Sequence, residues 1–289
     1  MPVYDKSGNL LQTVYSKDGQ LLSVAYSKDG TQIFPDGSAT FKVMTYNVQM
    51  FHGINAQTAM QTAIINKYKP DLIGMQELST YTVTNLPAAG QAMLADYPVK
   101  QLSNHKNKLM LATKGYQLSN VVIADFANQD PGDMEQYNET RAYIKADVQI
   151  GGKNVTLINT HLAVFSAEVR ALQMQEIFAM AQQCESCIIT GDFNSTAESV
   201  ESEAYIQIYK PFVDAGYNLA NNSPSSGFHN TFTSSSTATS LADLTAAIDT
   251  IIVSSDMNIV SVVFDDTKFD YLNGSAIDHI PVVATLQMN

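Results

Sequence analysis

Residues 187–194 read CIITGDFN, an apolar run followed at once by glycine, aspartate and asparagine. The run has the length of a buried strand, and the polar residues after it are typical of a turn at the end of that strand. The same arrangement recurs along the chain. Polar residues lie at the end of an apolar run in TYN (45–47), MQE (75–77), NTH (159–161), IDTIIV (248–253) and DHIPV (278–282). Carboxylates, amides and histidines placed repeatedly at strand ends predict one polar site on the rim of a sheet.

The other patterns predict a layered α/β protein with a single domain over residues 39–289. A hairpin is the clearest element, because apolar residues alternate on both sides of the turn Gly151-Gly152-Lys153. A helix at 56–69 is stopped by Pro70, and a second helix is capped by Ser166. Residues 221–240, rich in Ser, Thr and Asn, are expected to form a long surface loop. Further strands are predicted at 41–47, 71–77, 108–113, 248–254, 259–264 and 280–287.

The first 38 residues form a separate segment with a repeat of 11 residues, in which Tyr4, Tyr15 and Tyr26 fall in step. Each unit has the pattern of a short strand, a polar turn and another short strand, as in a β-hairpin. Such units bury little surface alone, so we expect them to stack on each other, on a second copy or on the main domain. An attachment or oligomerisation arm and a weakly ordered terminal extension are both open interpretations.

Composition limits the classes of function. The net charge of −12 argues against a broad basic platform for nucleic acid. No apolar run approaches the ~20 residues of a transmembrane helix. The N-terminus lacks the pattern of a secretory leader. This absence does not decide the location, and secreted and surface- or virion-associated locations both stay open. Cys184 and Cys187 lack the second pair that a zinc site needs, so a structural or incidental role is favoured over a redox role.

Read in order, TYN, MQE, NTHL, GDFN, ID-IIV and DH-PV resemble the motifs of the endonuclease/exonuclease/phosphatase superfamily, the DNase I-like proteins. The resemblance runs from about Phe41 to Leu286. It implies a four-layered α/β sandwich in which two packed mixed β-sheets are flanked by helices, with the repeats as an N-terminal extension. It also implies a phosphodiesterase that uses Mg²⁺ or Mn²⁺ and in-line attack by water, with Ca²⁺ as an optional structural ion.

The resemblance implies a metal site and a water site. Glu77 would be the main carboxylate ligand, with Asn47 beside it, because hard cations prefer oxygen ligands. Asp278 would join the metal shell or orient the histidine that follows it. Asp192 and Asn194 would hold and activate the attacking water, and Asn194 would also contact the substrate phosphate.

The resemblance implies acid–base and phosphate-binding roles as well. Asp249 and His279 would form the general base and its orienting carboxylate, which should raise the pKa of His279. His161 would donate to the phosphate as negative charge builds there. Arg141 stands where relatives place a phosphate-contacting arginine, and Asn107 resembles a second phosphate contact, although the usual preceding glycine is missing.

Two departures and the lack of tryptophan bear on the substrate. Ile277 replaces a serine that could contact phosphate, and the segment after IDTI has no substrate-loop signature. The absence of Trp argues against AP endonucleases and secreted sphingomyelinases. A DNase I-like endonuclease is therefore the leading interpretation, with nucleic acid as its substrate. A sphingomyelinase-like or small-molecule phosphoesterase and a catalytically vestigial binding or surface-attachment module are the alternatives. His52, His105 and His229 lack a motif and are expected at the surface.

Overall fold

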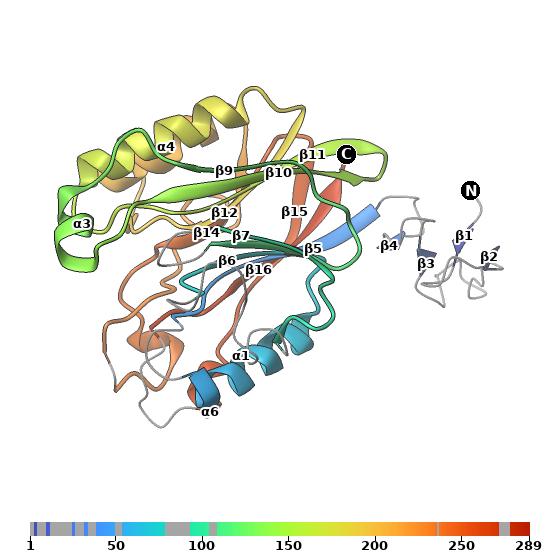
Figure 1. Cartoon of the computed structure of the whole chain (residues 1–289), viewed down its shortest axis with the longest axis horizontal. Coiled ribbons are helices and arrows are strands. Elements are labelled where there is room, and N and C mark those ends of the chain that lie inside the picture. Colours follow the sequence, from blue (N-terminus) through green and yellow to red (C-terminus); the bar gives the residue numbers. More distant parts are fainter. Residues whose placement is uncertain are drawn as a thin grey trace.

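The predicted four-layered α/β sandwich is confirmed, because two mixed β-sheets lie face to face. Helices α1 (Ile54–Tyr68) and α6 (Lys268–Tyr271) lie outside one sheet, and α4 (Ala167–Ala181) lies outside the other (Figure 1). No helix of the described ranges is long and apolar enough to cross a membrane. The computed structural model describes residues 3–4, 10–11, 25–26, 32–33, 39–49, 54–78, 93–103, 109–235, 237–271 and 278–289.

The first sheet has β5 and β6 at its centre, which run parallel with Asn47 opposite Gln76. On one side, β16 pairs antiparallel with β5, and β15 pairs antiparallel with β16. On the other side, β8 pairs antiparallel with β6, and β7 pairs antiparallel with β8. The bounds are β5 (Ala39–Asn47), β6 (Leu72–Gln76), β7 (Val99–Leu102), β8 (Met110–Thr113), β15 (Met257–Phe264) and β16 (Val282–Met288).

The second sheet has the order β13-β14-β12-β11-β10-β9. The predicted hairpin is β10 and β11, and β11 runs parallel to β12 with His161 opposite Asp192. The bounds are β9 (Ser119–Asp125), β10 (Ala142–Ile150), β11 (Lys153–His161), β12 (Ser186–Asp192), β13 (Asn218–Leu219) and β14 (Asp249–Val253).

The helices begin and end with identifiable signals. The hydroxyl of Ser166 accepts from the Val169 N–H, as predicted, and α1 is followed by Lys69 in a left-handed conformation before Pro70. Sequence patterns did not predict α3, β7 or β9. The bounds are α1 (Ile54–Tyr68), α3 (Pro131–Tyr137), α4 (Ala167–Ala181), the π-helical turn η1 (Tyr205–Tyr209), α5 (Lys210–Asp214), the 3₁₀ turn η2 (Leu241–Asp243) and α6 (Lys268–Tyr271).

The layer between the two sheets changes from apolar to polar towards one end. Inward-facing aliphatic side chains such as Val43 and Ile144 fill most of it. Nearer the strand ends, Asn159 donates to the carbonyls of residues 75 and 110 and accepts from Gln76. Gly74 permits this close approach, because a Cβ there would overlap the Thr190 hydroxyl of the other sheet. The polar network therefore joins the sheets directly beneath the ends of β6, β11 and β12.

Most of the 11-residue repeats lie outside the described residues. The described parts are four two-residue strands, of which β1 pairs with β2, β3 pairs with β4, and β4 pairs with the first residues of β5. A separate 39–289 domain and an attachment or self-association role for the repeats stay predictions. The bounds are β1 (Val3–Tyr4), β2 (Leu10–Leu11), β3 (Ala25–Tyr26) and β4 (Gln32–Ile33).

Candidate active site

The strand ends of both sheets meet at one edge of the sandwich. Strand β5 delivers Asn47, and Glu77 directly follows β6 beside it. In the second sheet, β11 ends at His161, β12 ends at Asp192, and the antiparallel β14 begins at Asp249 opposite Asp192. Parallel pairing in both sheets thus brings their carboxyl ends to the same place. The predicted rim site runs from Asn47 to His279, which are 232 positions apart in the chain.

Asn47 connects the two sheets at this edge. Its side-chain N–H group donates to Glu77 Oε1 and to Asp192 Oδ2, both at 2.9 Å. Its Oδ1 accepts from the backbone of Gln49, whose own side chain donates to Asp278 Oδ2 at 2.7 Å. Gln49 and Glu77 both have positive φ, 37° and 57°. Non-glycine residues rarely adopt this conformation and do so preferentially at functional sites, so the strand ends are held in strained positions.

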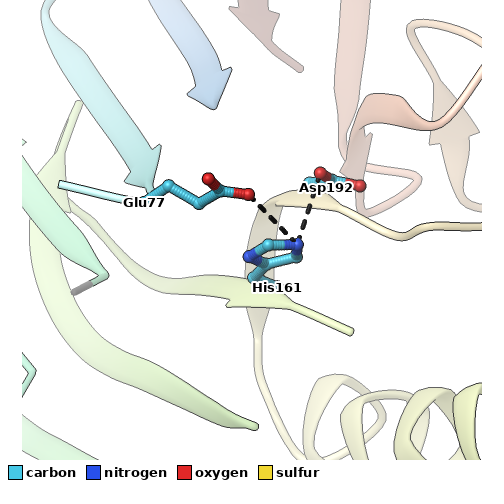
Figure 2. A group of neighbouring side chains, drawn as sticks. All are labelled: Glu77, His161 and Asp192. Atoms are coloured by element: carbon cyan, nitrogen blue, oxygen red, sulfur yellow. Dashed lines mark ion pairs between the residues drawn. The ribbon is translucent and has the colours of Figure 1, made fainter. Parts of the chain in front are cut away.

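His161 lies between two carboxyl groups (Figure 2). Its Nε2 is 3.4 Å from Asp192 Oδ2 and 3.9 Å from Glu77 Oε1. Burial, together with the positive charges of Arg141 and His279, lowers the pKa of His161 well below its ordinary value. The ring is therefore neutral at physiological pH, and it can offer one N–H to an acceptor without carrying charge.

His279 has the opposite electrostatic character. Its Nδ1 is 2.8 Å from Asp249 Oδ2, and its Nε2 is 3.4 Å from Asp192 Oδ2 and 3.8 Å from Asp278 Oδ1. Burial lowers the pKa of His279, but the three carboxylates outweigh it and raise that pKa to about 10. The predicted rise is confirmed. Thr231 holds the partner carboxylate in place, because its hydroxyl donates to Asp249 Oδ2 at 2.6 Å.

Asn194 lies beside the water-binding position that the sequence predicts. Its backbone N–H donates to Asp192 Oδ1 at 2.9 Å, and its side chain donates to the Leu162 carbonyl at 2.9 Å. Its φ of 48° is a further left-handed conformation at the site. Asn194 thus fixes the orientation of the Asp192 carboxylate and ties it to the loop that follows His161.

Arg141 is 2% exposed at the start of β10, at the same sheet edge as His161. Its Nε and Nη2 donate to the two oxygens of Asp133 at 3.0 Å each, and its Nη1 is 3.5 Å from Glu139 Oε1. Within the described part of the chain, Nη1 is buried and forms no hydrogen bond. A phosphate-binding role for Arg141 stays a prediction. Asn107 lies outside the described residues.

The carboxylates of the site suit a hard divalent cation. Burial raises the pKa of Glu77 and of Asp278, and it raises that of Asp192 to about 7. Asp278 Oδ1 is buried and has no hydrogen-bond partner within the described ranges. Ligand atoms of Glu77, His161 and Asp192 all lie within 4.8 Å of one another. Clustered, poorly hydrated carboxylates favour a bound cation, and their oxygens are the ligands that Mg²⁺ and Mn²⁺ prefer.

Several residues at the site carry no sequence motif. Residues 221–240 were expected at the surface, but Asn221 and Thr231 are fully buried, so that prediction is wrong for part of the segment. Lys268 is also buried, and its Nζ donates to the Asp278 carbonyl at 3.3 Å. His229 is exposed, as predicted, and His52 and His105 lie outside the described residues. Only the long-range contacts of the structure reveal Asn221, Thr231 and Lys268 as neighbours of the site.

Comparison with known proteins agrees with the geometry. A profile of the Endonuclease/Exonuclease/phosphatase family matches residues 44–268. No curated protein matches the sequence. A solved endonuclease/exonuclease/phosphatase from Bacteroides vulgatus is 19% identical, with 86% of this chain and 99% of that chain covered and a TM-score of 0.66.

Two eukaryotic structures have the same fold. D. rerio TDP2 complexed with single strand DNA product is 15% identical over 86% of this chain and 98% of that one, with a TM-score of 0.61. The human Nocturnin catalytic domain with bound sulfate is 18% identical over 86% and 95%, also with a TM-score of 0.61.

Proposed function

Since the chain belongs to the Endonuclease/Exonuclease/phosphatase family, we propose that it is a divalent-metal-dependent phosphodiesterase of the DNase I-like endonuclease type. One observation carries the proposal. A single carboxylate oxygen, Asp192 Oδ2, is 2.9 Å from Asn47 Nδ2 and 3.4 Å from Nε2 of both His161 and His279. An amide donor, a neutral imidazole and a protonated imidazole therefore surround one carboxylate oxygen. Such an arrangement suits proton transfer beside an anionic centre.

Each group has a distinct part in the proposed mechanism. A divalent cation held by Glu77, Asp278 and Asp192, with Asn47 beside it, would neutralise charge on the phosphate. Asp192 would accept a hydrogen bond from the attacking water. Neutral His161 would donate from Nε2 to a phosphate oxygen, where negative charge builds in the transition state.

His279 would exchange a proton with the water at Nε2, because Asp249 occupies Nδ1. The surrounding carboxylates raise the pKa of His279 to about 10, which keeps the ring protonated at neutral pH. The His279 ring can accept a proton only when the negative charge of the surrounding carboxylates is offset. Asp249 would then fix the tautomer, with Nδ1 protonated and Nε2 free.

Nucleic acid is the proposed substrate. The resemblance to D. rerio TDP2 with its single strand DNA product supports it, and the acidic net charge of −12 counts mildly against it. A lipid phosphodiester and a small phosphoester are the alternatives that an assay must separate. The substrate panel is therefore plasmid DNA, sphingomyelin and a p-nitrophenyl phosphodiester, each with Mg²⁺ or Mn²⁺.

Matched histidine variants test the mechanism on this panel. His161→Ala and His279→Ala should each lose most activity, because acid–base and electrostatic groups contribute about 10²–10⁴-fold. His229→Ala should retain activity, since His229 is exposed and its ring contacts that of Phe264 at a tilt of 37°. Plasmid nicking supports the endonuclease, whereas release from sphingomyelin without nicking assigns a lipid enzyme. Full activity of His279→Ala, or inactivity of the wild-type chain on the whole panel, contradicts the proposal.

A further inference from the structure

An exposed pair of aromatic rings lies at the edge of the sandwich where the candidate active site is built. Tyr137, at the end of α3, and Phe165, in the loop after β11, are 43% and 49% exposed. Their ring centroids are 5.5 Å apart and their planes are inclined by 26°, so the rings stack on each other. Met134, three residues before Tyr137 on α3, is 42% exposed. Exposed large apolar side chains that cluster in this way mark interaction sites more often than isolated ones do.

The loop that carries Phe165 is fastened to the start of α3. Phe165 contacts Gly132, where an added Cβ would come within 2.9 Å of the ring. Asp130 accepts from the N–H groups of both Gly132 and Ser166, at 2.8 and 2.6 Å. These bonds fasten the 162–166 loop to the first turn of α3. The exposure of the rings is therefore part of a fixed surface, and a ligand would not have to order it.

Hydrogen bonds of Asp133 connect this segment to the candidate active site. Asp133 accepts from the Val164 N–H as well as from the Arg141 guanidinium. Phe165 follows His161 by four residues, and Tyr143 pairs with Thr160, so the start of β10 and the end of β11 leave the sheet side by side. Figure 1 shows α3 at this end of the strands. The rings thus lie at the same edge of the sandwich as His161 and Arg141.

We propose that Tyr137 and Phe165 form a stacking platform for a nucleobase next to the scissile phosphate. The proposal rests on the proposed function and names the substrate class of the same site. The rings stack against each other, so the base would stack on an outer face of the pair. Stacking on aromatic side chains binds single-stranded nucleic acid with little dependence on sequence, because every base has a π-face.

The lack of basic side chains in α3 and in the residues beside it argues against a membrane surface as the partner. Residues 126–140 contain four acidic and no basic side chains. Interfacial membrane binding normally combines an apolar face with Lys and Arg that attract anionic lipids. Two flat rings also match a planar ligand better than a flexible chain.

Binding without cleavage tests the platform directly. The probe is a single-stranded oligodeoxynucleotide that carries 2-aminopurine, and binding is measured with Mg²⁺. All proteins carry His279→Ala, so that the probe is not cleaved. We expect quenching of the probe on binding, and roughly a 10-fold rise in Kd with loss of quenching for Tyr137→Ala/Phe165→Ala. Tyr137→Phe should retain both. Val260→Ala, which alters a 54% exposed residue on β15, is the control for removing exposed apolar surface.

The single variant Tyr137→Ala is expected to fold, because this ring is exposed. It should weaken oligonucleotide binding less than the double variant does. Unchanged Kd and quenching in a folded double variant would overturn the platform. So would loss of binding to neutral phosphatidylcholine vesicles with unchanged oligonucleotide binding, which would assign the rings to lipid.

A cleavage experiment separates the platform from the proposed function. The wild-type chain should cleave an oligonucleotide roughly 10-fold better than its analogue with abasic residues beside the scissile bond. The double variant should cleave both at similar rates. Equal cleavage of the two substrates by the wild-type chain overturns the platform and leaves the phosphodiesterase intact. Cleavage of neither overturns the phosphodiesterase, and the binding experiment still decides the platform.

Discussion

Replacing Asp133 by asparagine should destabilise the protein strongly, although the two side chains have the same shape. Asp133 is fully buried, and its two oxygens accept from Nη2 and Nε of Arg141 and from the Val164 N–H. An asparagine has one acceptor oxygen and one NH₂ group. Either orientation of the amide would place donors against donors and leave the guanidinium without its carboxylate.

The expected cost follows from the burial of the pair. Removing one partner of a buried ion pair costs about 3–5 kcal/mol, since the remaining charge is uncompensated. Glu139 keeps a contact with Arg141 Nη1 at 3.5 Å, so the lower end, about 3 kcal/mol, is expected. For a domain of this size, that corresponds to a fall in Tm of roughly 6–12 °C. Activity should fall as well, because the loop after His161 loses a fastening point.

Urea denaturation followed by circular dichroism measures the free energy of unfolding. Asp214→Asn is the matched control, because Asp214 forms an exposed pair with Lys210 and should change stability by less than about 0.5 kcal/mol. A change below about 1 kcal/mol for Asp133→Asn would refute the reasoning.

Three further predictions concern other contacts. Thr231→Val should lower kcat roughly 10-fold or more with little change in KM, because Asp249 loses a hydrogen bond that orients it; steady-state kinetics measures this, and an unchanged kcat would contradict it. The hydrogen bond with Cys187 lowers the pKa of the Cys184 thiol to about 6, so alkylation of Cys184 should increase as pH rises through 6 and level off near 7. Cys187→Ala should move this profile to higher pH. Mass spectrometry of the peptide with Cys184 measures the alkylation, and an unshifted profile would contradict the explanation. Gly74→Ala should destabilise by about 3 kcal/mol in urea, since its Cβ overlaps the opposite sheet.

The sequence predicted those parts of the fold that have a local signal. The buried strands that end at Asn47 and Asp192 are short apolar runs, and the hairpin before His161 alternates in hydrophobicity. Edge strand β9 escaped prediction because its side chains are mostly exposed and show no buried face. Helix α3 has no apolar stripe, although Asp130 as N-cap and Pro131 at its first position are recognisable start signals.

The candidate site was predicted only where a residue belongs to a motif. Glu77 and His279 stand in short blocks of fixed order, and the structure brings both to one edge. Thr231 and Gln49 reach the site through contacts with residues 18 and 229 positions away in the chain. Such contacts depend on the packing of two sheets, which local patterns do not encode. Asp133 likewise gains its importance only from its burial against Arg141.

The dependence of hydrolysis on a divalent cation held by Glu77 is the most direct test of the account. Hydrolysis of the panel substrate that the wild-type chain cleaves is measured after removal of metal with EDTA and then across a titration of Mg²⁺, for the wild-type chain and Glu77→Gln. We expect no hydrolysis in EDTA, recovery with Mg²⁺, and at least about a 10-fold higher Mg²⁺ requirement for Glu77→Gln, because a neutral amide binds a hard cation more weakly than a carboxylate. Full activity in EDTA, or coincident Mg²⁺ curves for the two proteins, would contradict it.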